Sequence, residues 1–164
     1  MWELPKAVSL VAGAGEGTTE LNAFDRALMD AGIANLNFIR VTSILPPGAR
    51  VVPLPRLMAG MLVPAVYAHI IGHTPGERIA AALGVGLSRE EYGVIMEHSH
   101  TGTAENAEAI VRRMVQEAFQ QRGLPLDEVV VVVREHGVER VGCAVAVALL
   151  WPHMDRVGTG GEGG

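Results

Sequence analysis

Two amphipathic helical segments stand far apart in the sequence, and most of the other apolar segments have the pattern of β-strands. The first helix is predicted to begin after Thr18 or Thr19 and to end before Gly32, with its apolar residues spaced by three and four. The second helix is predicted from the cap residue Thr103 to Gln121. Because the helices do not alternate strictly with strands, this order favours an α+β fold over a doubly wound parallel sheet.

The predicted strands are short apolar or alternating segments. A run of five valines at 129–133 predicts a buried strand, and other strands are predicted at 8–12, 36–41, 63–71, 92–96 and 141–151. The segment 78–87 is ambiguous, because its alanines favour a helix whereas Gly84 and Gly86 argue against one. The glycine-rich segment 13–17 is predicted to be a tight turn between the first strand and the first helix.

Composition and length exclude several classes of protein for this chain. The 164 residues predict one domain at 1–157, followed by a disordered tail at 158–164. Apolar residues make up 49% of the chain and charged residues 19%, which excludes a disordered chain and a coiled coil. The net charge of −5 argues against a nucleic-acid partner. The one cysteine, Cys143, excludes an internal disulfide framework and a cysteine-built zinc site, and it favours a reducing compartment, the cytoplasm.

No membrane segment is predicted. The apolar stretch at 57–71 is interrupted by Pro64 and His69, so it is too short for a helix that spans a bilayer. Near the N-terminus, Glu3 and Pro5 are atypical of the basic end of a signal peptide. The sequence therefore predicts a protein without a membrane partner.

Two patterns typical of ligand sites are present but incomplete. The glycines at 13–17 lie between a predicted strand and a predicted helix, as in a nucleotide-binding loop, but the dinucleotide pattern needs its third glycine one position later. The pairs His69/His73 and His98/His100 have spacings found among metal ligands, but no further ligand set is evident. The sequence therefore predicts no metal site, and a nucleotide-binding domain remains an alternative hypothesis.

A Thr-Ser pair follows the strand predicted at 36–41 and precedes a double proline. In a strained turn, the Oγ atom of Ser43 can attack the carbonyl carbon of Thr42 and convert the peptide bond into an ester. Elimination then cleaves the chain, and the dehydroalanine at the new N-terminus hydrolyses to a pyruvoyl group. Thr42 and Ser43 are therefore a predicted self-cleavage site.

The pattern Val-Thr-Ser-Ile-Leu-Pro-Pro at 41–47 resembles the self-cleavage site of pyruvoyl-dependent arginine decarboxylases. Upstream, the segment 21–33 (Leu-Asn-Ala-Phe-Asp-x-x-Leu-x-x-Ala-Gly-Ile) resembles the first helix of that family. Downstream, the segment 92–98 (Tyr-Gly-x-Ile-x-Glu-His) resembles the strand that carries its catalytic glutamate. The resemblance extends from about Val8 to Leu150, and it departs from the family at the residue before the serine, which is threonine here.

The resemblance implies a catalytic machinery, residue by residue. Ser43 becomes a covalent pyruvoyl group, which condenses with the substrate amine and accepts electrons as carbon dioxide leaves, without pyridoxal phosphate and without a metal. Glu97 is the general acid that protonates the α-carbon, and Asn37 is a further catalytic residue. Asp25 binds the guanidinium group of the substrate through paired hydrogen bonds, and Leu21 is a second substrate-binding residue.

The resemblance also implies the architecture and the assembly. The expected fold is a four-layer αββα sandwich with mainly antiparallel sheets, assembled as a trimer or a dimer of trimers with active sites between subunits. The spacing agrees, because six extended residues span roughly 20 Å and Asn37 cannot reach its own Ser43 along a straight strand. The expected reaction converts L-arginine to agmatine. The alternatives are a pyruvoyl-dependent decarboxylase of another amino acid and an unprocessed oligomeric binding protein.

Overall fold

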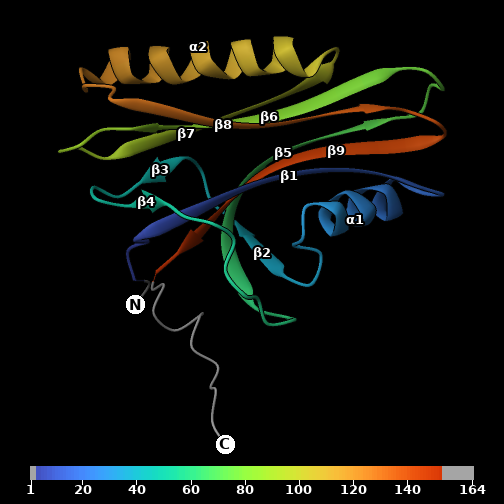
Figure 1. The fold of residues 1–164 in the computed structure, drawn as a ribbon, viewed down its shortest axis with the longest axis horizontal. Helices are drawn as coiled ribbons and strands as arrows, with labels where there is room; N and C mark the ends of the chain where they lie inside the picture. The colour runs from blue at the N-terminus through green and yellow to red at the C-terminus, as the bar shows by residue number, and fades with distance from the viewer. Residues whose placement is uncertain (1–2, 153–164) are drawn as a thin grey trace, which may run out of the picture.

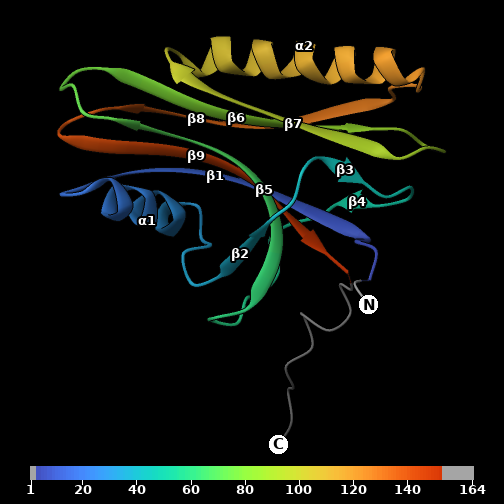
Figure 2. The same ribbon diagram turned by 180° about the vertical axis from the view of Figure 1, so that it is seen from behind.

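Two β-sheets stack face to face, and each carries one helix on its outer surface (Figure 1, Figure 2). The computed structural model describes residues 3–152, so the tail predicted at 158–164 lies outside the described residues. Helix α1 (Glu20–Asp30) covers the first sheet, and helix α2 (Ala104–Arg122) covers the second. The layers therefore follow the order helix, sheet, sheet, helix, which confirms the predicted α+β sandwich.

Most neighbouring strands are antiparallel, as expected. The first sheet has the strand order β2-β5-β9-β1-β4, and the second has the order β3-β7-β6-β8. The parallel pairs in the described part of the chain are β1 with β4 and β2 with β5. The strands are β1 (Ala7–Gly17), β2 (Asn37–Arg40), β3 (Ile44–Leu45), β4 (Arg50–Val51), β5 (Leu62–Gly72), β6 (Arg78–Leu87), β7 (Gly93–Thr101), β8 (Glu128–Gly137) and β9 (Val141–Trp151).

Strand β9 lies in the middle of the first sheet and is buried along nearly all of its length. Its side chains alternate between the two faces of the sheet. Cys143, Val145 and Val147 therefore pack with α1, whereas Ala144 and Ala146 face the second sheet. A third apolar layer lies between the second sheet and α2. The molecule thus has one core between its sheets and one under each helix.

Both helices begin and end within a residue or two of their predicted bounds. Thr19 caps α1, and its Oγ1 atom accepts a hydrogen bond from the backbone N–H of Asn22 at 3.1 Å. Thr103 caps α2 in the same way, through the N–H of Asn106 at 3.2 Å. Gly123 ends α2 in the left-handed conformation, with φ 65°.

No helix in the described part of the chain has both the length and the apolar character that a bilayer crossing requires.

The turn predicted at 13–17 is wrong, because β1 continues through these residues to Gly17. Helix α1 folds back over them, and the glycines provide the space for its backbone. A Cβ atom on Gly13 would stand 2.3 Å from the carbonyl oxygen of Ala27, and one on Gly17 would stand 2.4 Å from the nitrogen of Ala23. The glycines therefore serve helix–strand packing, and the nucleotide-binding alternative loses the loop on which it depended.

Glycine also explains the ambiguous segment 78–87, which is strand β6. A Cβ atom on Gly86 would stand 2.4 Å from the Phe119 ring of α2, and Gly84 lies under the same helix. The valine run at 129–133 is part of β8, as predicted, but its side chains are only half-buried because β8 is an edge strand.

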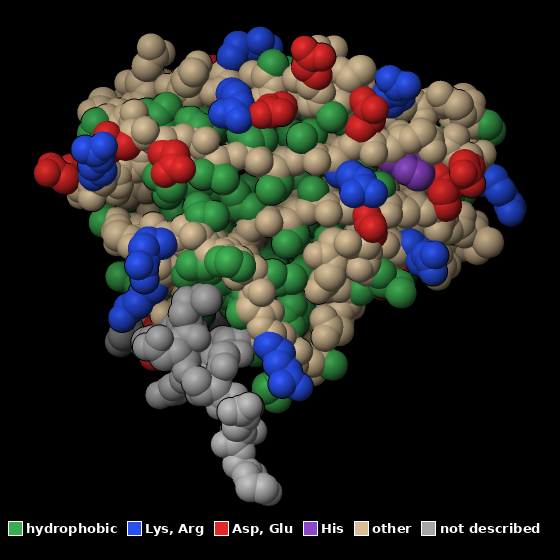
Figure 3. All heavy atoms as spheres, in the orientation of Figure 1, with side chains coloured by type: hydrophobic (Ala, Val, Ile, Leu, Met, Phe, Trp, Pro, Cys, Tyr) green, Lys and Arg blue, Asp and Glu red, His purple; other side chains and the backbone are tan. Residues whose placement is uncertain are grey.

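Charged and apolar side chains are distributed unevenly over the surface. In Figure 3, which keeps the orientation of Figure 1, many of the charged side chains lie in the upper part of the molecule, near α2, and hydrophobic side chains show through the middle of the face. Several large hydrophobic side chains among the described residues are exposed, namely Leu4, Leu21, Met29, Ile44, Met58 and Leu62. These side chains are available for contacts with other molecules.

We expect Gly13→Ala to destabilise the fold by about 2–3 kcal/mol, because α1 must move away from β1 to admit the methyl group. Urea unfolding of the purified protein measures this change. Gly137→Ala is the matched control, since a Cβ atom on this glycine of β8 would meet no atom within 4 Å. A Gly13→Ala protein as stable as the wild type would contradict the close packing of α1 on β1.

Candidate active site

The predicted cleavage site lies where the chain passes from the first sheet to the second. Strand β2 is at an edge of the first sheet and β3 is at an edge of the second, so residues 41–43 cross between them. The N–H of Val41 donates to the carbonyl oxygen of Ala65 on β5 at 3.0 Å. The carbonyl oxygen of Ser43 accepts from the N–H of Ile95 on β7 at 2.7 Å. The predicted scissile bond is therefore held between two anchored residues.

A cavity of about 260 Å³ opens beside this crossing. Thr42 and Ser43 line it, together with Pro64 of β5, Leu150 of β9 and Glu3 near the N-terminus. Thr42 is exposed and Ser43 is half-buried. Solvent and a small substrate can therefore approach the peptide bond between them.

Glu97 lies on β7 near the same crossing. The register pairs Ile44 with Val94, which puts Ser43 opposite Ile95. Glu97 is two residues farther along the strand, so its side chain leaves β7 on the same face as Ile95 and roughly 7 Å away along the strand. The structure thus brings the predicted general acid and the predicted pyruvoyl precursor to neighbouring positions at the edges of the two sheets.

Arg40, the last residue of β2, joins the two sheets through Glu97. Its Nη2 atom donates to Oε1 of Glu97 at 3.1 Å and to the carbonyl oxygen of Tyr67 at 3.3 Å. Its guanidinium also lies over the Tyr67 ring, 4.6 Å from the ring centre. The side chain of Glu97 is therefore oriented by a cation that is itself held by β5.

The two carboxylate oxygens of Glu97 have different surroundings. Oε1 accepts the hydrogen bond from Arg40, whereas Oε2 is buried and has no hydrogen-bond partner among the described residues. Burial raises the pKa of Glu97, and the charge and hydrogen bond of Arg40 oppose this change without reversing it. A carboxyl group with a raised pKa can hold a proton and deliver it, which is what a general acid needs.

A second cavity, of about 320 Å³, surrounds this ion pair and is lined by Arg40, Tyr67, Ala68, His69, Glu97, His98 and Ser99. Burial lowers the pKa of His69, and the charge of Arg40 lowers it further. Burial likewise lowers the pKa of His98, with a smaller contribution from His100. Both imidazoles are therefore neutral at pH 7, and they add no positive charge beside Glu97.

Three of the four histidines considered as metal ligands, namely His73, His98 and His100, have other hydrogen-bond partners. The Nε2 atom of His73 lies 2.7 Å from Oε1 of Glu20. The Nε2 atom of His98 lies 3.2 Å from Nδ1 of His100, and Nε2 of His100 donates to the carbonyl oxygen of Thr103 at 3.1 Å. Within residues 3–152, no group of three or more His, Cys, Asp or Glu side chains could hold a metal ion.

The other predicted site residues line neither of these cavities. Leu21 and Asp25 are exposed on α1, which lies on the outer side of the first sheet and well apart from β3 in both views (Figure 1, Figure 2). Asn37 begins β2, and its Nδ2 atom donates to the carbonyl oxygen of Gly60 at 3.2 Å. Within one chain, these three residues therefore lie away from the predicted cleavage site.

Sequence reasoning missed Arg40, Tyr67 and His69 as members of the site. Arg40 stands only three residues before Ser43, so its position beside the cleavage motif was a usable signal. Tyr67 and His69 come from β5, and nothing in the local sequence connects that strand with the cleavage site.

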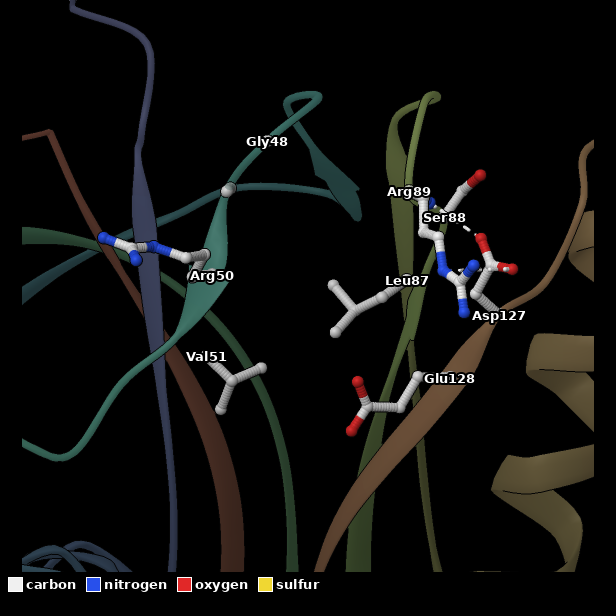
Figure 4. Close-up of a pocket in the computed structure, with 9 residues that line it drawn as sticks. Gly48, Arg50, Val51, Leu87, Ser88, Arg89, Asp127 and Glu128 are labelled. Carbon is white, nitrogen blue, oxygen red and sulfur yellow. Dashed lines mark hydrogen bonds and ion pairs between the residues drawn. The ribbon is translucent and has the colours of Figure 1, made fainter.

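A larger cavity, of about 490 Å³, lies elsewhere, between β4 and the adjoining ends of β6 and β8 (Figure 4). The side chains of Val51, Leu87 and Glu128 face its interior, while Arg50 points away from it. Arg89 pairs with Asp127, whose Oδ2 atom accepts the backbone N–H of Arg89 at 2.7 Å. This cavity contains none of the predicted site residues.

Comparison with known proteins matches nearly the whole chain to a single protein family. A family model described as pyruvoyl-dependent arginine decarboxylase matches residues 7–155. A protein of that name from Methanocaldococcus jannaschii is 49% identical over 152 residues, which cover 92% of each chain. Another, from Pyrococcus abyssi, is 44% identical over 156 residues, covering 93% of this chain and 99% of the relative.

We expect the Glu97 carboxyl to keep its proton above pH 4.5, the ordinary value for glutamate, because burial disfavours the ionised form. Infrared difference spectra between the wild type and Glu97→Gln, recorded across a pH titration, isolate its protonated C=O band. The unfolded chain loses this proton first as pH rises, so Glu97 destabilises the fold increasingly from pH 4.5 through its folded pKa. A band that titrates at or below 4.5 would contradict the assignment.

Proposed function

The chain belongs to the pyruvoyl-dependent arginine decarboxylase family, and from this membership we propose that it converts L-arginine to agmatine and carbon dioxide. It is accordingly a carbon–carbon lyase with a covalent pyruvoyl cofactor. The observation that carries the proposal is the family match over nearly the whole chain. The structure supports it, because the Thr42–Ser43 peptide lies between the two sheets and beside the half-buried Glu97.

Self-cleavage between Thr42 and Ser43 is the proposed source of the cofactor. The Oγ atom of Ser43 attacks the Thr42 carbonyl, and elimination from the ester releases the chain of residues 1–42 with a new carboxylate. The chain of residues 43–164 gains water and loses ammonia as its dehydroalanine becomes a pyruvoyl group. The backbone hydrogen bonds of Val41 and Ser43 support this step, because they hold the Thr42–Ser43 peptide in place between the two sheets.

The residues around position 43 fit a pyruvoyl group. The Ile95 N–H already binds the carbonyl oxygen of residue 43 at 2.7 Å, and this carbonyl remains after the side chain has been converted. Close by on β7, Glu97 carries an oxygen that is buried and without a hydrogen-bond partner among the described residues. When formed, the group supplies a carbonyl that accepts electrons from the substrate as carbon dioxide leaves.

We assign Glu97 as the general acid that returns a proton to the substrate α-carbon. Its raised pKa keeps the carboxyl protonated at a pH where an exposed glutamate is ionised. The N–H of Ile95 fixes and polarises the carbonyl of residue 43, which favours electron withdrawal from the reacting carbon. These two groups belong to one strand, so β7 aligns them.

The guanidinium-binding role of Asp25 requires a second copy of the chain. Asp25 and Leu21 lie on α1, apart from Ser43, and Asn37 lies at the opposite end of β2 from Arg40. We propose that these residues complete the Ser43 site of a neighbouring subunit in a trimer or a dimer of trimers. The exposed apolar side chains of Leu21 and Leu62 support contacts between copies.

We place the protein in the cytoplasm on the evidence of its single cysteine. Cys143 is a free thiol in β9, and burial raises its pKa to about 12. Such a thiol is not ionised at neutral pH, so it neither attacks substrates nor forms disulfides readily. A chain with a single cysteine has no internal disulfide, which suits a reducing compartment.

We expect denaturing mass spectrometry of the purified protein to find two chains, 1–42 and 43–164, with the larger lighter by one ammonia than a chain that begins with serine. Ser43→Ala should remain a single uncut chain, because it lacks the attacking hydroxyl. An uncut wild-type chain after prolonged incubation would contradict the proposed function and favour an unprocessed binding protein.

We expect Asp25→Asn to lower kcat/KM for arginine by about 100-fold or more, because the guanidinium loses its charged partner. Steady-state assays of agmatine formation measure the loss. Glu91→Gln is the matched control, since it neutralises an exposed carboxylate between β6 and β7. Unchanged turnover of arginine in Asp25→Asn would contradict the guanidinium-binding role of Asp25.

Mixed assemblies test whether sites are shared between subunits. Asp25→Asn and Glu97→Gln chains, each strongly impaired alone, are co-expressed with different tags and purified as hybrids. Recovery of activity in the hybrid is expected, because some sites then combine an intact Asp25 from one chain with an intact Glu97 from another. A verified hybrid without activity would contradict the shared site.

A further inference from the structure

The position of Arg40 points to a role that the family name does not assign. We propose that Arg40 is a positioning residue that holds Oε1 of Glu97, so that the proton for the reaction resides on Oε2 and is delivered from it. The proposal rests on the proposed function, since it concerns the general acid of that reaction. It is carried by the geometry of three side chains, Arg40, Glu97 and Tyr67.

Hydrogen-bond chemistry distinguishes the two oxygens of Glu97. A guanidinium can only donate, so Oε1, at 3.1 Å from Nη2 of Arg40, must act as an acceptor. In a neutral carboxyl the carbonyl oxygen is a stronger acceptor than the hydroxyl oxygen, so this hydrogen bond favours the proton on Oε2. Oε2 is buried and has no hydrogen-bond partner within residues 3–152, so no described group competes for this proton. Arg40 thus selects which oxygen is the donor.

The guanidinium of Arg40 is itself held in place. It donates to the carbonyl oxygen of Tyr67 at 3.3 Å and stacks over the Tyr67 ring at 4.6 Å from the centre. Its backbone ends β2, and the cleavage residue Ser43 follows three positions later. Tyr67 and the end of β2 therefore fix both the direction of the arginine and the orientation of the carboxyl that it binds.

Arg40 makes and breaks no covalent bond in the proton transfer from Glu97. The O–H bond at Oε2 breaks and a C–H bond forms at the substrate α-carbon, while the O–H electron pair stays on the carboxylate. The new negative charge is then shared with Oε1, which already faces the guanidinium. Arg40 therefore stabilises the carboxylate that remains, and solvent must return the proton before the next turnover.

The groups around Glu97 determine its pH dependence. Arg40 from β2 is the charged neighbour, and Tyr67 and His69 from β5 and His98 from β7 complete the cavity lining. The two imidazoles have lowered pKa values and are neutral at pH 7. Loss of the Arg40 charge should therefore raise the pKa of Glu97 further, since burial then acts unopposed.

The test compares Arg40→Met, Arg40→Lys and a control, Arg112→Met, which removes an exposed arginine from its ion pair with Glu108 on α2. Infrared titration of the Glu97 C=O band is the first measurement, because it does not require turnover. We expect the pKa of Glu97 to rise by about one unit in Arg40→Met and to stay within about half a unit in Arg40→Lys and Arg112→Met.

Kinetics on the processed protein is the second measurement. We expect kcat of Arg40→Met to fall about 10- to 100-fold, with KM for arginine within about threefold of the wild type. The alkaline limb of the kcat–pH profile should move to higher pH by about one unit, in step with the infrared titration. Arg40→Lys keeps the positive charge but loses the planar set of donors of the guanidinium. Its kcat should therefore fall, while the pH of the alkaline limb should stay that of the wild type.

Defined outcomes would overturn the proposal. A large rise in KM with unchanged kcat and pH profile would assign Arg40 to the substrate carboxylate instead. An unchanged Glu97 band in Arg40→Met would show that Arg40 does not act on this carboxyl. If Arg40→Met does not cleave itself, the infrared titration of the intact chain and the kinetics of Arg40→Lys still test the role of Arg40. A wild-type protein without decarboxylase activity would instead contradict the proposed function itself.

Discussion

The passage of the chain from one sheet to the other at residues 41–43 is the constraint on which the site depends. Two backbone hydrogen bonds define it, one from Val41 to β5 and one from Ile95 to the carbonyl of Ser43. They attach a short connection to two stacked sheets whose positions are set by the apolar core between them. The Thr-Ser peptide is therefore positioned by the whole sandwich and not by its own sequence. A mobile loop with the same residues would leave the serine hydroxyl without a defined approach to its neighbouring carbonyl.

The charges around Glu97 are set by the same packing of the two sheets. The sheets bring Arg40 and Glu97 together from different strands, and the carboxyl is buried enough that its pKa rises despite the adjacent cation. The surrounding histidines do not add to the positive charge, because burial lowers their pKa values. The carboxyl therefore keeps its proton to a higher pH than an exposed glutamate does, and it also has a fixed orientation. These two properties oppose each other when a glutamate simply forms an exposed ion pair.

Much of the fold could be predicted from the sequence, but the glycine pattern at 13–17 could not be interpreted correctly without the structure. The caps Thr19 and Thr103 and the strand at 141–151 follow from local rules, and they were predicted within a residue or two. The glycines at 13–17 were assigned to a turn, because a glycine pattern alone does not distinguish a loop from a strand under a closely packed helix. Only the position of α1, whose backbone lies where their Cβ atoms would stand, separates the two explanations.

The sequence by itself determined the α+β class, the helix ends and the cleavage motif, since each depends on residues that are close together in the chain. It also pointed to Glu97 through the family resemblance. The tertiary structure alone decided that Arg40 contacts this glutamate, because the two residues are 57 positions apart and lie on different sheets. It also separated Asp25 from Ser43 within one chain, whereas the separation of Asn37 from Ser43 already followed from their spacing along a strand. Local spacing contains no information about which strand edges become neighbours, and that contact is decided when the two sheets pack.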